Sequence, residues 1–204
     1  MNIIKLLTGS RFQLLIQEAK LIDHLIKKGG EKLLKKSSPE QENAINPMWY
    51  RLSLPNPFSV GFMFPLLLIP LVWGWSTLVY HFDLSISLRA ILSLSIAPFA
   101  CIYFVFILYG LRCGYISGLL LIHYFYLFNI LLLITGCFLI TIQATEFNEW
   151  IRRLRIYPLQ LLSIYLCRYN MNNNSFYKLI SFFHTTRLIL EAKKFRESHN
   201  KKIK

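Results

Sequence analysis

The sequence predicts an all-α integral membrane protein, with about three membrane-embedded helices flanked by amphipathic basic helices on the cytoplasmic side. Apolar residues make up 54% of the 204 residues and charged residues only 16%, whereas about a quarter of an ordinary soluble domain is charged. The charges also avoid the middle of the chain, because only Asp83, Arg89 and Arg112 lie between residues 52 and 145. A soluble core of that length would need polar faces on its helices, and this stretch has almost none.

Three uncharged runs in this middle stretch are long enough to cross a bilayer, for which about 20 residues suffice. They are membrane segment 1 at residues 59–82, segment 2 at residues 90–111 and segment 3 at residues 113–145. Pro65 and Pro70 predict a kink in segment 1. Segment 3 exceeds the hydrocarbon thickness of about 30 Å, so it must tilt or project. The short connection between segments 2 and 3 predicts a tight helical hairpin.

The two ends of the chain carry nearly all of its net charge of +13. Residues 1–36 predict an amphipathic basic region, because apolar residues recur at helical spacing opposite polar ones; they are Phe12, Leu15, Ile16, Ala19, Ile22 and Ile26. Its apolar stripe suits an anionic membrane surface, or equally packing on a partner or on the chain's own tail. Residues 37–58 predict a proline-containing linker and interfacial entry, and residues 146–204 a basic amphipathic tail.

Positive charge close to the bilayer indicates which ends stay in the cytoplasm. The arginines just past segment 3 favour a cytoplasmic C-terminus, and the basic N-terminal region also favours the cytoplasm. Three spans cannot place both ends on one side. The conflict leaves three explanations: segment 1 is re-entrant, the N-terminal region is translocated, or segment 3 is broken. The residues expected to meet lipid headgroups or to set the topology are Trp73, Trp75, Trp150, Arg152, Arg153 and Arg155.

Four residues in the membrane segments are candidates for helix packing. Gly110, Gly114 and Gly118 have the four-residue spacing that lets helices approach closely, although Gly110 and Gly114 could simply form the turn. Asn129 lies at the centre of segment 3, where a polar group needs a protein partner. It favours an interhelical hydrogen bond over a substrate or proton path, because no carboxylate accompanies it at depth.

The sequence carries no arrangement of residues that predicts chemistry. The five histidines show no metal-ligand spacing, and no nucleophile motif or phosphate-binding glycine loop occurs. We therefore expect no catalytic residue, no cofactor and no metal site. Nucleic acid is not an expected partner either, because no nucleic-acid-binding motif accompanies the positive charge. The expected partners are the lipid bilayer, its anionic lipids and other membrane-protein subunits.

The function predicted from these features is interaction rather than catalysis. The spans would anchor the chain, and the basic ends would bind the membrane or partner proteins. This predicts a non-enzymatic accessory or structural subunit of a larger bacterial inner-membrane assembly, for example a type IV secretion or conjugation machine. The alternative is a membrane immunity or exclusion protein that acts through its spans. A small transport component that uses Asn129 and His123 is the third hypothesis.

Overall fold

The protein is described by a computed structural model covering residues 3–45, 60–82, 84–143 and 157–203, all of whose regular elements are helices. Three long apolar helices have the length and composition needed to cross a membrane, as the sequence predicted. The helices are α1 (Ile3–Thr8), α2 (Ser10–Lys28), α3 (Glu31–Leu34), α4 (Pro39–Ala44), α6 (Met63–Tyr80), α7 (Ile86–Arg112), α8 (Ile116–Gln143), α10 (Tyr157–Met171) and α11 (Asn174–Ile203).

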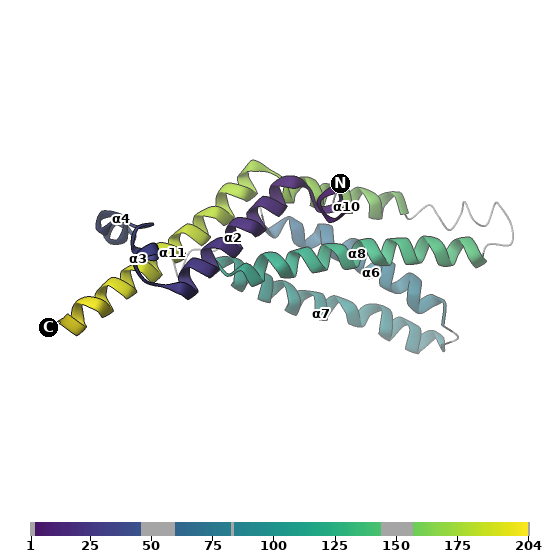
Figure 1. Cartoon of the computed structure of the whole chain (residues 1–204). Helices are drawn as coiled ribbons and strands as arrows, with labels where there is room; N and C mark the ends of the chain where they lie inside the picture. Colours follow the sequence, from purple (N-terminus) through teal and green to yellow (C-terminus); the bar gives the residue numbers. More distant parts are fainter. Residues whose placement is uncertain (1–2, 46–59, 83, 144–156, 204) are drawn as a thin grey trace.

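The helices α6, α7 and α8 pack side by side with alternating direction and form a bundle (Figure 1). Helix α7 begins one turn before residue 90, where the uncharged run starts. Ser85 caps this first turn by accepting a hydrogen bond from the backbone N–H of Leu88. The guanidinium of Arg89 donates to the carbonyls of Phe82 and Leu84. A single arginine can therefore stay in the first turn of a membrane helix, because carbonyls at the helix boundary bind it.

The two prolines of α6, Pro65 and Pro70, affect the hydrogen bonds of the helix differently. Pro65 lies in the first turn of the helix, where a missing backbone N–H costs no hydrogen bond. Pro70 lies inside the helix and is buried. Close contact between α6 and α8 occurs at Gly74, where an added Cβ would lie 2.9 Å from the Cβ of Leu132. Helix α6 is thus a full member of the bundle.

Helix α10 is a fourth member of this bundle, which the sequence did not predict. It packs along α6 and α8. An added Cβ on Gly136 of α8 would lie 2.6 Å from its Tyr157 hydroxyl, and Gln160 and Ser163 face inward and are buried. Pro158 is the second residue of the helix, a position that proline tolerates. Residues 157–203 therefore contain one helix that packs within the bundle, α10, and one that extends past it, α11.

The exposed side chains of the bundle are strongly apolar. In α8 the large exposed side chains follow one face of the helix, and they are Tyr124, Phe128, Leu131, Ile134, Phe138 and Ile142. At about 1.5 Å per residue, the stretch from Tyr124 to Ile142 rises about 27 Å, which is close to the hydrocarbon thickness of about 30 Å. We call this face the apolar band of α8. The first two turns of α8 lie outside it.

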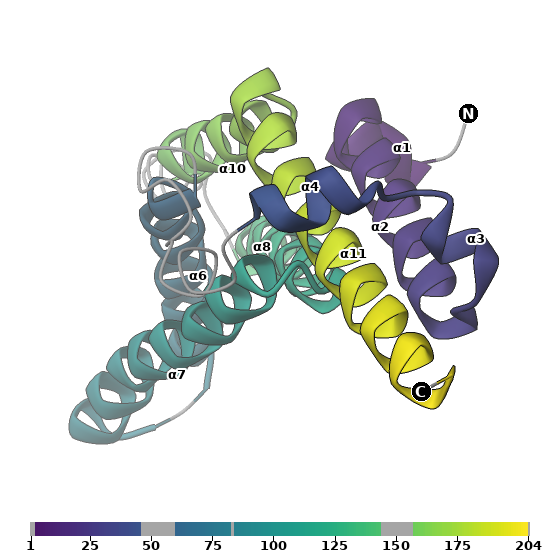
Figure 2. The same cartoon turned by 90° about the vertical axis from the view of Figure 1, so that its left-hand side faces the viewer.

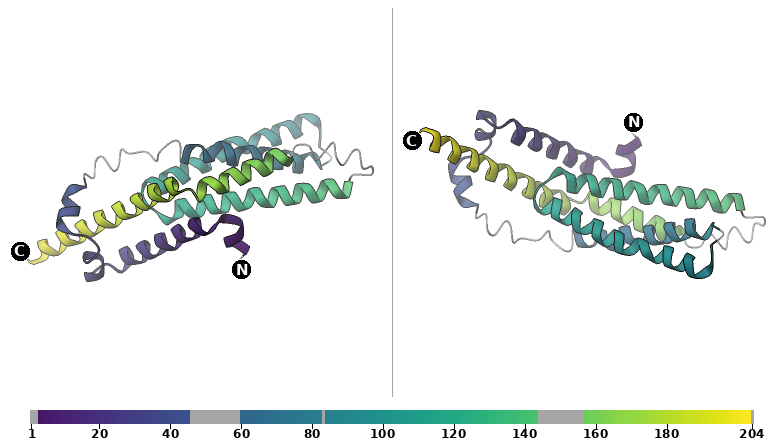
Figure 3. Two further views of the ribbon diagram at one scale, coloured as in Figure 1. Left: turned by 90° about the horizontal axis from the view of Figure 1, so that it is seen from above. Right: turned by 90° about the horizontal axis from the view of Figure 1, so that it is seen from below.

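Helices α2, α3, α4 and α11 form an arm that extends past one end of the bundle, and the first half of α2 packs against the bundle beside α8 (Figures 1 and 2). Helices α2 and α11 run side by side in the same direction, and α10 and α11 follow one another along the molecule (Figure 3). A second apolar core holds the arm together, with Leu33, Leu188, Ile189 and Ala192 at its centre. Helix α4 is fixed to α11 by an ion pair of 3.1 Å between Glu42 and Arg196.

Candidate interaction site at the hairpin tip

The connection between α7 and α8 contains only Cys113, Gly114 and Tyr115. Gly114 has a φ of +65°, in the left-handed region that favours glycine. The N–H of Tyr115 donates to the carbonyl of Gly110 at 2.9 Å, and the N–H of Gly114 donates to that of Leu111 at 3.0 Å. These bonds close the turn and leave the carbonyl of Gly114 pointing away from the hairpin.

The other two predicted glycines bring the backbones of α7 and α8 together. An added Cβ on Gly110 would lie 2.8 Å from the backbone nitrogen of Gly118. An added Cβ on Gly118 would lie 2.5 Å from the backbone nitrogen of Leu111. Gly110 and Gly118 thus meet across the hairpin, while Gly114 forms its turn. The three glycines have different tasks and do not line one face of a single helix.

The tip of this hairpin is held by α11. The carbonyl of Gly114 accepts hydrogen bonds from Nδ1 of His184 at 2.8 Å and from the guanidinium of Arg187 at 2.9 Å. A carbonyl oxygen can only accept, so Nδ1 of His184 carries a hydrogen. An added Cβ on Gly114 would lie 2.6 Å from the carbonyl oxygen of Phe183. The tip and the backbone of α11 are therefore in direct contact.

Arg187 connects three parts of the chain. It pairs with Asp23 of α2, it donates to Gly114, and its guanidinium lies 4.4 Å from the centre of the Tyr115 ring. The side chains of Arg187 and Asp23 are only 16% and 19% exposed, so water screens their attraction less than it would on an open surface. We call Asp23, Gly114, Tyr115, His184 and Arg187 the tip cluster.

The environment of His184 favours its neutral form. Burial lowers the pKa of His184 below its ordinary value of 6.5, and the positive charge of Arg187 lowers this pKa further. The bond to the Gly114 carbonyl and the negative charges of Asp23 and Glu18 oppose the lowering. Because burial is the largest of these effects, His184 is neutral at pH 7. The tip cluster then contains one cation and one anion, and they are paired.

The remaining predicted residues do not join this cluster. Asn129 is fully buried, and its amide donates to the carbonyl of Phe125 in its own helix at 2.9 Å. The indole N–H of Trp75 donates to the carbonyl of Leu92 at 2.9 Å and so links α6 to α7. Trp73 is exposed on the bundle surface. Trp150, Arg152, Arg153 and Arg155 lie outside the described residues.

Sequence reasoning missed Asp23, His184 and Arg187 as members of one cluster. Asp23 and Arg187 are separated by 164 positions in the chain, and no motif marks either of them. One signal was available in the α2 stretch, where Asp23 lies between Lys20 and Lys27 and is one of only two acids, with Glu18, in an amphipathic helix. Such an acid indicates an ion pair with another element, but the sequence does not show which one.

The tip cluster can hold helices in place, and we assign it no chemistry. Among the described residues, no group of three or more His, Cys, Asp and Glu side chains could bind a metal ion. The three long apolar helices, the exposed apolar band and the attached arm define the class, which is an all-helical protein with three helices long and apolar enough to cross a membrane. Comparisons with known protein families, curated proteins and solved structures found no match.

Proposed function

We propose that this protein is a non-enzymatic structural subunit of a larger bacterial inner-membrane assembly, for example a type IV secretion or conjugation machine. The observation that carries the proposal is the tip cluster. It fixes the α7–α8 hairpin to both helices of the arm through Gly114, Arg187 and Asp23. A bundle joined to an arm in this way holds a partner at a set position relative to the membrane.

The arm offers the partner a stiff and polar surface. Its core of Leu33, Leu188, Ile189 and Ala192 is buried, and the exposed side chains beyond it on α11 are polar, namely Lys194, Glu197, Ser198, His199 and Asn200. The capping box of Ser38 and Gln41 fixes the start of α4, and Glu42 binds both Arg196 and Ser37. A surface that is already ordered loses little entropy on binding, which favours a stable complex.

Helix α10 runs back along the bundle in the direction opposite to α8. This direction supports a topology with both ends of the chain in the cytoplasm. Helices α6, α7, α8 and α10 alternate in direction, so α2 and α11 meet at the same end of the bundle. Three helices have the length and composition to cross a membrane. With the shorter α10, of 15 residues, as a fourth membrane-embedded helix, both basic ends would lie on one side, as the charge distribution of the sequence requires. The positive-inside rule assigns that side to the cytoplasm.

Co-purification from detergent-solubilised membranes tests the proposed role. Complete deletion of α2 or α11 is unsuitable, because Phe12 and Phe176 are core residues of the bundle. A truncation after Glu197 removes the end of α11, including the exposed Ser198, His199 and Asn200. A tagged full-length chain expressed at its native level should recover a constant set of membrane proteins. The truncated chain should reach the same abundance and lose those partners. Recovery of the full-length chain alone, after crosslinking, would overturn the proposal.

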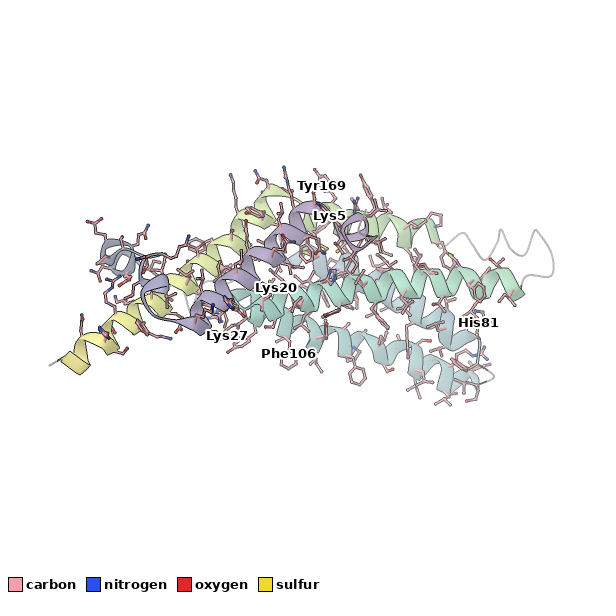
Figure 4. The ribbon with its side chains drawn as sticks, in the orientation of Figure 1. Lys5, Lys20, Lys27, His81, Phe106 and Tyr169 are labelled. Carbon is pink, nitrogen blue, oxygen red and sulfur yellow. The ribbon has the colours of Figure 1, made fainter. Side chains whose placement is uncertain are left out.

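The alternative function is membrane immunity or exclusion, and the outer face of α7 favours it. Phe99, Ile102, Val105 and Phe106 are all more than half exposed on this helix, and Figure 4 shows Phe106 pointing away from the bundle. Such a face could contact a foreign pore or channel within the bilayer. In that case the truncation after Glu197 would leave activity intact, whereas polar substitutions at Ile102 and Phe106 would abolish it.

A further inference from the structure

A hollow of about 300 Å³ lies where the α1–α2 junction meets the α10–α11 junction. Its lining includes the side chains of Arg11, Arg168, Tyr165 and Tyr169, together with Gly9 and Asn172, and it contains no acidic residue. The volume is at the small end of the range for ligand pockets, which is about 300–1,000 Å³. The hollow is thus a basic and aromatic pocket, and we call it the junction pocket.

The walls of the junction pocket are built by specific contacts. The amide of Asn172 donates to the carbonyl of Thr8 at 2.8 Å, and its oxygen accepts from the N–H of Phe12 at 3.3 Å. Gly9 has a φ of +92°, and an added Cβ there would lie 2.2 Å from the side chain of Asn172. The two helix junctions are therefore locked together, and the pocket between them has a fixed shape.

The two arginines of the junction pocket are held in place but not neutralised. Arg168 donates to the carbonyl of Leu6 at 3.0 Å, and Arg11 donates to the carbonyl of Asn172 at 3.4 Å. Neither forms an ion pair with a carboxylate of the described residues. Each guanidinium has five N–H donors, and one terminal nitrogen of each makes these bonds. Because Nε of Arg168 is buried, it is the terminal nitrogens that are available to a ligand. Two guanidinium groups in one pocket favour an anion with several oxygens, such as a phosphate.

The junction pocket also lies at the edge of the apolar surface. The hydroxyl of Tyr126 on α8 donates to the carbonyl of Leu7 at 3.2 Å, which places α1 beside the start of the apolar band at Tyr124. Along α10, exposed Leu159 and Leu162 are followed by exposed Tyr165 and Tyr169. A change from aliphatic side chains to tyrosine and arginine is typical of the membrane–water interface. Figure 4 shows Tyr169 and Lys5 near this junction.

We propose that the junction pocket binds the phosphate of an anionic lipid headgroup, with Arg11 and Arg168 as the phosphate ligands and Tyr165 and Tyr169 beside the upper acyl region. The chemistry that is recognised is a phosphate anion, and the position at the band edge identifies a lipid as its source. This site is independent of the proposed role as a subunit. A bound lipid would bridge the N-terminal α1–α2 junction and the C-terminal α10–α11 junction.

Lipid retention by the full-length chain tests the site. The purified protein, in neutral detergent, is mixed with equal amounts of phosphatidylglycerol and phosphatidylcholine and examined by native mass spectrometry. The wild type should retain phosphatidylglycerol preferentially. Replacing each arginine should lower the ratio of retained phosphatidylglycerol to phosphatidylcholine by about fivefold or more. The double variant R11Q/R168Q should therefore lose the preference. The matched control is K27Q/K28Q, which removes two exposed positive charges at the other end of α2 and should keep the preference.

Two further measurements distinguish loss of the lipid site from misfolding, and lipid binding from the binding of free phosphate. The single variant R11Q alters only an exposed arginine with one weak bond, so its loss of preference should appear with unchanged helicity and gel-filtration behaviour. Inorganic phosphate, added without lipid, should not stabilise the wild type at millimolar concentration. Stabilisation by phosphate with no preference between the lipids would overturn the lipid assignment. Equal losses in R11Q/R168Q and K27Q/K28Q would overturn the site itself.

Discussion

Gly114 and Phe183 lie so close together that a methyl group added to Gly114 would be 2.6 Å from the carbonyl oxygen of Phe183. The contact joins the turn of a membrane hairpin to the middle of α11, far apart in the chain. It exists only because residue 114 has no side chain. The carbonyl of Gly114 is then close enough to α11 to accept from both His184 and Arg187.

Substitution of Gly114 by alanine should therefore destabilise the protein in two ways. The φ of +65° costs a residue with a Cβ about 1–2 kcal/mol, and the overlap with Phe183 adds to this. Gly30→Ala is the matched control, since Gly30 has a φ of +75° and no atom within 4 Å of an added Cβ. Thermal unfolding in detergent should show a clearly larger loss for Gly114→Ala. Equal losses would mean that α11 does not contact the hairpin tip.

The ion pair between Asp23 and Arg187 should make a measurable contribution to stability. A double-mutant cycle with Asp23→Ala and Arg187→Ala should give a coupling energy of about 0.5–3 kcal/mol, as found for residues in direct contact. The pair is mostly shielded from water, so moderate salt should weaken the coupling only slightly. The measurement is the free energy of unfolding of the four proteins in one detergent.

The control for this cycle is Glu191 with Lys194, which are 2.6 Å apart on the surface of α11. Exposed pairs at this spacing contribute about 0.3–0.5 kcal/mol. Their coupling should be smaller than that of Asp23 and Arg187 and should disappear at high salt. A coupling near zero for Asp23 and Arg187 would show that α2 is not linked to α11 through this pair.

Stability should fall as the pH drops below about 6.5, and His184 should be a main cause. Burial lowers its pKa in the folded protein, so the unfolded chain, with a histidine pKa of about 6.5, binds more protons in this range. The free energy of unfolding must then decrease as the pH falls. Protonation would also bring a second positive charge next to Arg187, which Asp23 and Glu18 offset only in part.

His184→Asn should reduce this pH dependence, because asparagine keeps an N–H donor for Gly114 and does not titrate. The midpoint of thermal unfolding at pH 7.5 and pH 5.5 provides the comparison. The exposed His199 near the C-terminus serves as the control, and His199→Asn should leave the dependence as it is in the wild type. The assignment to His184 fails if its variant loses as much stability at pH 5.5 as the wild type does.

The parts of the fold that were predictable are those governed by local composition. Three apolar helices follow directly from three uncharged runs, and each lies within one or two turns of its predicted limits. Helix α10 was missed for a physical reason. It has only 15 residues, and Gln160, Arg168 and Asn170 lower its hydrophobicity, so no window of about 20 apolar residues exists there. Its packing on α6 and α8 comes from tertiary contacts that composition does not reveal.

The candidate site was predictable only in part, for a similar reason. The glycines of the hairpin stand out in the sequence because their spacing is unusual, and the structure gives each of them a close contact. Asp23, His184 and Arg187 are ordinary residues of amphipathic helices until α2 and α11 lie side by side. The direction and register of that pair depend on distant contacts such as Phe12 with Phe176, whose ring centres are 6.4 Å apart.

If α10 runs back through the membrane beside α8, the topology of the chain can be predicted. The ends of α2 and α11 should then lie on the same side of the membrane, and the start of α7 should lie on the other side. Single cysteines at Lys28, His199 and Ser87, all exposed, would report these positions once the four native cysteines are replaced. An impermeant maleimide added to intact cells should label the Ser87→Cys variant alone. In inverted vesicles it should label the Lys28→Cys and His199→Cys variants instead. Labelling of Lys28→Cys and His199→Cys from opposite sides would show that α10 does not return through the bundle, since an odd number of crossings would then separate the two basic ends.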